Sequence, residues 1–154
     1  MYTKSFAKKY HEEEFVEKEF ILLPFFKEIL NNKSWKKLVD LGCGSGYYAR
    51  RFASKDKKIV GIDANVNQLS IARKIEEETK LGIDYVESDL NNLKTIESDS
   101  FDVAFLNYVI VEISDKEIIK QIFNEAYRVL KKGGILIIGQ VHPHNINKNS
   151  HVVK

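Results

Sequence analysis

Residues 39–46, with the sequence VDLGCGSG, combine a short apolar run, one carboxylate and three glycines at alternate positions. Val39 and Leu41 suit a buried strand of a parallel sheet, because such strands are covered on both faces. Glycine lets the backbone turn sharply and approach a bound molecule closely. The segment therefore predicts a strand that ends at a ligand-binding turn.

Strands and helices alternate after Trp35, a pattern typical of a parallel sheet covered by helices. Short runs rich in Val, Ile, Leu and Phe are the expected strands, at 37–41, 58–62, 83–86, 102–106 and 135–141. We therefore predict an α/β fold in one domain of 154 residues, which the chain length favours. Its expected parts are a helical segment at 1–35, a core at 36–141 and a tail at 142–154.

Helices are expected between most of these strands. Apolar residues on one helical face predict a helix over about 115–131, with Ser114 and Glu117 as a capping box and Gly133 as its C-terminal stop. A second helix is expected after Asn65, its predicted N-cap. A third is expected to begin within the glycine turn, near Ser45.

Two further segments have a different pattern. Residues 91–100 are polar and few, so we expect a loop between the third and fourth strands. The first 35 residues are dense in Phe, Leu and Val, and Pro24 divides their apolar run. Because Pro is tolerated in the first turn of a helix, we predict two helices with Pro24 near the start of the second.

A dinucleotide site also joins a strand, a glycine turn and a helix, but its glycines are spaced Gly-x-Gly-x-x-Gly. In this chain Tyr47 stands where that pattern has its third glycine. A large side chain there packs poorly beside a pyrophosphate. The spacing therefore disfavours an NAD-dependent oxidoreductase.

Class I S-adenosylmethionine-dependent methyltransferases have a first motif that reads acidic-x-Gly-x-Gly-x-Gly, which this chain resembles at Asp40, Gly42, Gly44 and Gly46. Ser100–Ile113 resembles the fourth strand and following loop of the type 11 subgroup, and Arg128–Ile138 its fifth-strand entrance. The resemblance implies a Rossmann-like parallel sheet with strand order 3-2-1-4-5 and an N-terminal helical cap. It also implies S-adenosylmethionine as the cofactor and S-adenosylhomocysteine as the product.

Asp63 lies about twenty residues beyond the glycine turn, where a carboxylate can accept hydrogen bonds from both hydroxyls of a ribose. Ala64 follows it and is assigned to the same site. The alternative is that Asp63 acts only as a cap before the helix, a role that Asn65 can take instead. A ribose carboxylate supports a nucleoside ligand without choosing between cofactors.

The resemblance assigns further cofactor contacts. Asp89 is expected to contact the adenine amino group, because an ionised carboxylate only accepts hydrogen bonds, and Leu90 to offer a backbone N–H and an apolar wall. The backbone near Asn107, together with Asp40 and Gly42, is expected to hold the methionine amino and carboxylate groups. No metal is expected, since His142 and His144 lack an acidic or Cys partner.

Composition narrows the possible partners. The 44% hydrophobic and 30% charged residues are ordinary for a globular domain, and no apolar run approaches the roughly 18 residues that span a membrane. Lysines alternate with glutamates within a net charge of +2, which gives no specific signal for nucleic acid. Cys43, the only cysteine, is expected to fill space, and the N-terminus lacks a signal-peptide core, which together favour the cytoplasm.

We therefore expect a methyltransferase that acts on a small-molecule acceptor. The acceptor and any general base stay unknown, with Tyr10, Tyr47, Tyr108 and Glu112 as candidates to line its site and ordinary packing as the alternative for each. A non-catalytic or partner-dependent S-adenosylmethionine-binding protein is the second reading, because the family's final strand hairpin has no counterpart in the sequence. The fifth strand would then be an exposed edge, and we expect it to pair in a homodimer.

Overall fold

The computed structural model describes residues 18–140 of the chain. The chain divides into two units, Met1–Trp35 and Lys36–Lys154. Tyr10, His142, His144 and the predicted tail lie outside the described residues. The predictions that concern them stay predictions.

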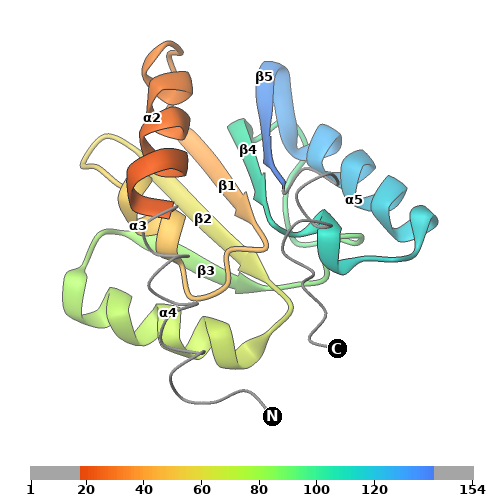
Figure 1. Cartoon of the computed structure of the whole chain (residues 1–154), viewed down its shortest axis with the longest axis horizontal. Coiled ribbons are helices and arrows are strands. Elements are labelled where there is room, and N and C mark those ends of the chain that lie inside the picture. The colour runs from red at the N-terminus through yellow and green to blue at the C-terminus, as the bar shows by residue number, and fades with distance from the viewer. Residues whose placement is uncertain (1–17, 141–154) are drawn as a thin grey trace, which may run out of the picture. The chain divides into compact units, whose positions relative to one another are not determined.

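Five parallel strands form one sheet in the second unit (Figure 1). Their order is β3-β2-β1-β4-β5, which confirms the predicted α/β architecture and strand order. The strands are β1 (Lys37–Leu41), β2 (Lys58–Asp63), β3 (Ile83–Glu87), β4 (Phe101–Asn107) and β5 (Leu130–Gly139). Among the described residues β5 pairs with β4 alone, and its pairing in a homodimer stays a prediction.

Helices cover both faces of this sheet. They are α3 (Tyr47–Phe52), α4 (Val66–Thr79) and α5 (Lys116–Val129), with a short 3-10 helix η2 (Ile110–Glu112) after β4. Figure 1 shows α5 on the opposite side of the sheet from α3 and α4. This arrangement buries the central strands on both faces, as a doubly wound fold requires.

The core therefore has two layers, separated by the sheet. On the α5 side, Val39 and Leu41 pack with Ile122 and Ala126. On the other side, the ring of Phe105 lies 5.3 Å from that of Tyr48 and 5.2 Å from that of Phe52. Within β4, Ala104 and Leu106 belong to the first layer and Phe105 to the second, because successive side chains of a strand point to opposite faces.

One predicted N-cap agrees with the structure, and another is corrected. Asn65 caps α4 as predicted, its side chain accepting hydrogen bonds from the N–H groups of Asn67 and Gln68. The capping box at Ser114 is wrong: Asp115 is the N-cap of α5, and its carboxylate accepts from the N–H of Glu117. A carboxylate one residue closer to the helix competes well for this role, because it also favours the positive end of the helix dipole.

The C-terminal end of α5 also differs from the prediction. The helix ends at Val129, and the chain passes directly into β5 at Leu130, which pairs with Phe101. The register then shifts, and regular pairing resumes at Ile135, the predicted start of the strand. Gly133 does have a positive φ of 82°, but it lies in the irregular part of β5 rather than at the helix end.

The polar segment 91–100 is a loop, as predicted, and two side chains of α5 hold it. Arg128 donates to the backbone carbonyls of Leu93 (2.8 Å) and Ile96 (2.9 Å), while its ion pair with Glu125 orients the guanidinium. Glu125 in turn accepts from the N–H of Leu93 at 2.7 Å. The loop is therefore ordered by charge-assisted hydrogen bonds in place of a helix.

Two helical elements form the described part of the first unit, a π-helix η1 (Lys18–Leu22) and α2 (Leu23–Asn31). Pro24 lies in the first turn of α2, as predicted. The two elements follow each other without a gap, because Leu22 keeps helical dihedrals and η1 runs directly into α2. A proline in a first turn removes no helical hydrogen bond, so the helical path can continue.

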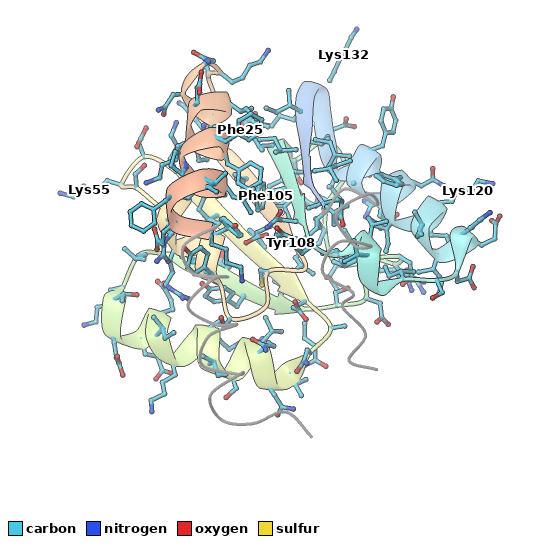
Figure 2. All side chains as sticks on the ribbon, viewed as in Figure 1. Phe25, Lys55, Phe105, Tyr108, Lys120 and Lys132 are labelled. Carbon is cyan, nitrogen blue, oxygen red and sulfur yellow. The ribbon has the colours of Figure 1, made fainter. Side chains whose placement is uncertain are left out.

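Lysines are dispersed over the second unit. Lys55, Lys120 and Lys132 extend outward from separate elements (Figure 2). No helix among residues 18–140 is long and apolar enough to cross a membrane.

Candidate functional site

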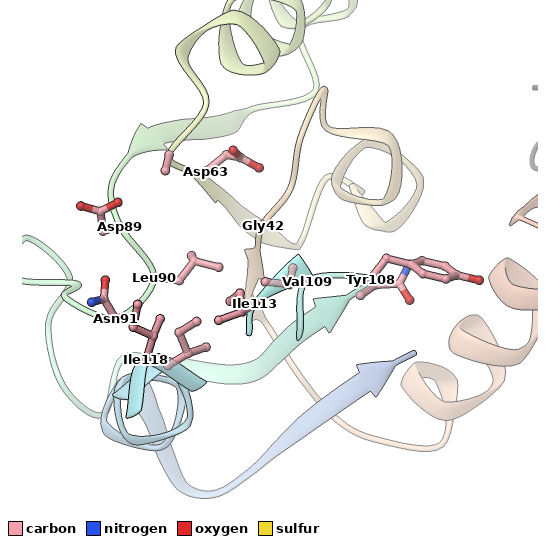
Figure 3. Close-up of a pocket in the computed structure, with 12 residues that line it drawn as sticks. Gly42, Asp63, Asp89, Leu90, Asn91, Tyr108, Val109, Ile113 and Ile118 are labelled. Carbon is pink, nitrogen blue, oxygen red and sulfur yellow. The ribbon is translucent and has the colours of Figure 1, made fainter. Parts of the chain in front are cut away.

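A pocket of about 640 Å³ lies at the carboxyl ends of β1, β2, β3 and β4 (Figure 3). Ligands of open parallel sheets bind at this end, where the strand order reverses beside β1. The pocket is lined by Gly42, Asp63, Ala64, Asp89, Leu90, Asn91, Asn107, Tyr108, Val109, Ile113, Ile118 and Ile122.

Six of the nine residues predicted for the cofactor line this pocket, and they come from four different loops: Gly42, Asp63, Ala64, Asp89, Leu90 and Asn107. The other three, Asp40, Gly44 and Gly46, are not among the lining residues. They belong instead to the structure that carries Gly42. The predicted set therefore separates into a lining group and a supporting group.

The glycine turn is tied to the end of β2. The N–H groups of Gly42 and Cys43 both donate to the carbonyl of Ile62, at 2.8 and 3.0 Å. Gly42 has a φ of 79°, and a side chain on it would collide with Val109 across the pocket. Glycine is therefore required here both by the backbone conformation and by the space that the pocket needs.

Asp63 serves the backbone and the pocket at once. Its Oδ2 accepts from the N–H of Gly44 at 2.7 Å, and its Oδ1 accepts from the N–H of Asn65 at 2.8 Å. Each carboxylate oxygen has a further lone pair, so the side chain can still accept hydrogen bonds from a ligand. The alternative of a simple helix cap is not what the structure shows, because Asn65 caps α4.

Asp40 lies beneath the turn and is only 2% exposed. Burial raises the pKa of its carboxyl to about 7; the backbone N–H of Ala49 opposes this rise, and the charge of Asp63 adds to it. Its Oδ2 has no hydrogen-bond partner among the described residues. The first-motif carboxylate is therefore buried and is not among the described residues that line the pocket.

The far wall of the pocket is apolar. Figure 3 shows Asp63 and Asp89 on one side and Ile113 and Ile118 on the other, with Leu90 pointing between them. Ile118 and Ile122 come from α5. Both belong to the apolar face from which this helix was predicted, but neither was predicted to contact a ligand. The available signal was that this apolar face continues to the first turn of α5, beyond what the sheet covers.

Asn107 and Tyr108 form the end of the pocket at the tip of β4. The Oδ1 of Asn107 is buried and has no hydrogen-bond partner among the described residues. Tyr108 has a φ of 58°, which is strained for a residue with a side chain, and its N–H donates to the carbonyl of Gly139 at 2.8 Å. Its ring points away from Asp89 (Figure 3).

Among residues 18–140, those that line the pocket include two carboxylates and no lysine, arginine or histidine. Asp63 is half-buried and Asp89 is exposed. A site with this balance attracts cations and repels anionic groups, most strongly where the apolar wall excludes water.

Tyr47 and Cys43 are not among the described residues that line the pocket. Tyr47 packs under the guanidinium of Arg51, 3.7 Å from its ring centre. Glu112 ends η2. Burial, followed by the charges of Asp40 and Asp63, raises the pKa of the Cys43 thiol far above its usual range, which leaves it protonated.

Comparison with known proteins gives a consistent set of relatives. The profile of a family described as methyltransferase domain, type 11, matches residues 39–138. A ubiquinone biosynthesis O-methyltransferase of Actinobacillus pleuropneumoniae is 27% identical over 124 residues, 78% of this chain and 52% of that protein. Phosphoethanolamine N-methyltransferase 3 of Arabidopsis thaliana is 32% identical over 117 residues, 73% of this chain and 22% of that protein.

Among solved structures, an S-adenosylmethionine-dependent methyltransferase of Methanosarcina mazei superposes with a TM-score of 0.65 and 26% identity. The match covers 71% of this chain and 55% of that one. The chain therefore spans about half, or less, of the relatives it matches.

Proposed function

The chain belongs to the type 11 family of methyltransferase domains, and we propose that it binds S-adenosylmethionine in the pocket beside β1 and transfers its methyl group to a small-molecule acceptor. The observation that carries this proposal is the charge of the pocket. Two carboxylates and an apolar wall, with no cationic side chain among the described lining residues, suit a sulfonium and an ammonium group beside an adenosine.

The same charge balance disfavours NAD. A pyrophosphate needs N–H donors or cations, and the carboxylate of Asp63 already occupies the N–H of Gly44. A Tyr-x-x-x-Lys spacing, common in one group of NAD enzymes, does occur at Tyr127 and Lys131. Neither residue lines the pocket, and the amine of Lys131 is paired with Asp102 at 2.7 Å.

The residues present fit the parts of the cofactor. Asp63 is suited to the ribose hydroxyls through the free lone pairs of its carboxylate. Asp89 can accept from the adenine amino group, and Leu90 and Ile118 supply apolar surface for the faces of the base. Together these residues account for the adenosine half.

The methionine half is assigned to the other end of the pocket. The buried Oδ1 of Asn107, which has no hydrogen-bond partner among the described residues, can accept from a donor such as an ammonium group. The open space beside Gly42 lets that group approach the backbone. Asp40 lies behind the turn, and its carboxylate favours a positive charge in front of it when it is ionised.

When bound, the cofactor supplies a methyl group whose bond to a positively charged sulfur is already activated for displacement. The chain is left with the task of holding the acceptor in line with that bond and excluding water, and such positioning can supply about 7–11 kcal/mol of the barrier. The apolar residues Val109, Ile113 and Ile118 exclude water from the wall they form. A general base is needed only for an acceptor that must lose a proton.

The relatives do not narrow the acceptor atom, because one is named for an O-methyl and another for an N-methyl product. We propose a small molecule of either kind. The proposal also keeps two predictions from the sequence: a helical cap at residues 1–35, and Tyr108 as a residue that lines the acceptor site.

Isothermal titration calorimetry with S-adenosylmethionine, S-adenosylhomocysteine and NAD tests the cofactor assignment. We expect binding of the first two and none of NAD; selective binding of NAD would overturn the proposal. Formation of S-adenosylhomocysteine across a panel of amine, phenol and carboxylate acceptors then tests transfer. Tight binding without turnover on the panel or after addition of a cell extract would favour the second reading, a binding protein that does not catalyse.

A further inference from the structure

Tyr85 lies on β3 and fills a space left by two glycines of other elements. A side-chain carbon on Gly61, in the neighbouring strand β2, would lie 2.8 Å from Cδ1 of Tyr85 and 2.9 Å from Sγ of Cys43. A side-chain carbon on Gly46, at the end of the glycine turn, would lie 2.8 Å from Cζ of the same ring and closer still to its hydroxyl. The phenol therefore reaches across β2 to the underside of the turn.

The chain around this contact is held by hydrogen bonds. Gly46 has a φ of 77° and donates its N–H to the carbonyl of Cys43 at 2.9 Å. Arg50 donates from its guanidinium to the carbonyl of Ser45. The turn is thus held by the hydrogen bond between Gly44 and Asp63, and the ring of Tyr85 packs against it at Gly46.

Glycine at position 61 has no backbone reason, since its φ lies outside the left-handed region. The reason is space, because residue 61 is buried where Tyr85 and Cys43 meet. Burial also raises the pKa of Tyr85 to about 12, with the charge of Arg50 opposing that rise, so the phenol stays protonated at neutral pH.

We propose that Tyr85 is a positioning residue for the cofactor: its ring, seated over Gly61, sets the path of the turn from Gly42 to Gly46 and with it the shape of the pocket. Tyr85 does not line the pocket, so any effect on binding passes through the turn. This inference rests on the proposed cofactor and adds a residue to the site that binds it.

The test compares the affinity of S-adenosylhomocysteine for three variants by calorimetry. Y85F keeps the ring and is expected to bind within about twofold of the wild-type protein, whereas Y85L removes the ring and is expected to bind about tenfold more weakly. Y127A is the matched control, because Tyr127 is 83% exposed and its removal should leave the affinity unchanged. All are measured well below the melting temperature, where a merely less stable protein is still folded and its affinity does not change.

Gly61→Ala disturbs the same contact from the other side. Its added methyl group pushes on Tyr85 and Cys43, and we expect a loss of affinity of about tenfold although residue 61 is remote from the ligand. In the double variant Y85L/G61A the methyl group gains room, so the combined loss should be smaller than the product of the single losses. If Y85L does not fold, Y85M takes its place with the same expectation.

The outcomes are separable. A wild-type protein that does not bind S-adenosylhomocysteine would remove the proposed function and this inference with it. Normal wild-type binding together with unchanged affinity in Y85L, or strictly multiplicative losses in the double variant, would overturn the role of Tyr85 and leave the proposed function standing.

Discussion

The carboxylate of Asp63 accepts a hydrogen bond of 2.7 Å from the backbone N–H of Gly44, so the end of β2 holds the turn that follows β1. The other oxygen of the same carboxylate holds the N–H of Asn65 before α4. One side chain thus joins two loops and also lines the pocket. Its removal is expected to affect the ligand directly and through the turn.

Asp63→Asn leaves a side chain of equal size with only one accepting atom, so one backbone N–H loses its acceptor and a ribose hydroxyl loses a charged one. We expect the free energy of S-adenosylhomocysteine binding to weaken by about 1–3 kcal/mol. Calorimetry measures this, with D84N as the control, because Asp84 is exposed on β3 and pairs with Lys58. Wild-type affinity in a folded D63N protein would exclude Asp63 from the site.

Asp40 makes the ligand-free protein less stable as the pH rises. Its pKa in the folded state is about 7, above the ordinary 3.8, because burial disfavours the ionised form. Between pH 3.8 and about 7 the folded state therefore holds a proton that the unfolded state has lost. The free energy of unfolding decreases as the pH rises through this range. Asp40→Asn should show a smaller fall than the wild-type protein in urea titrations at about pH 5 and pH 8. Identical pH dependence in both proteins would contradict this.

Asp102 has the opposite effect at the other end of the sheet. Burial alone would raise its pKa, but hydrogen bonds from the amine of Lys131 and the N–H groups of Lys37 and Lys36 lower it to about 2. Its contribution to stability is therefore present above pH 3.8 and is lost as the pH falls toward about 2. We expect D102N to be less stable by about 1–2 kcal/mol at neutral pH, since the carboxylate is partly screened by solvent.

Chemical denaturation at neutral pH and near pH 3 checks this prediction. The difference between the wild-type protein and D102N should shrink as the pH falls. A difference that stays constant would show that the packing of the side chain, and not its charge, is what the variant loses.

Arg128→Lys removes the planar fork that holds the loop 91–100. A lysine cannot donate at once to Glu125 and to the carbonyls of Leu93 and Ile96. We expect a loss of stability of about 1–3 kcal/mol, measured by urea denaturation. K120R, a change on the exposed face of α5, is the control. Faster hydrogen exchange in the loop of R128K would locate the effect there, whereas unchanged exchange would contradict it.

The sheet could be predicted from the sequence because its signals are local. Short apolar runs, such as the one with Val39 and Leu41, indicate strands from neighbouring residues alone. Asn65 caps α4 through contacts with residues two and three positions away. The N-cap of α5 was predicted at Ser114 but is Asp115. Neighbouring polar residues compete for this role, and the sequence does not show which of them reaches the N–H group.

Some residues of the candidate site could likewise be predicted from the sequence, and others could not. The order of the glycines, Asp63 and Asp89 along the chain was enough to place a pocket at the carboxyl ends of the strands, because parallel strands bring these ends to one edge of the sheet. That Ile118 of α5 completes the pocket, that Asp40 lies behind it, and that Tyr85 supports the turn through Gly61 was decided by the tertiary structure alone. These contacts join residues distant in the chain, and only packing against the sheet determines which side chains meet.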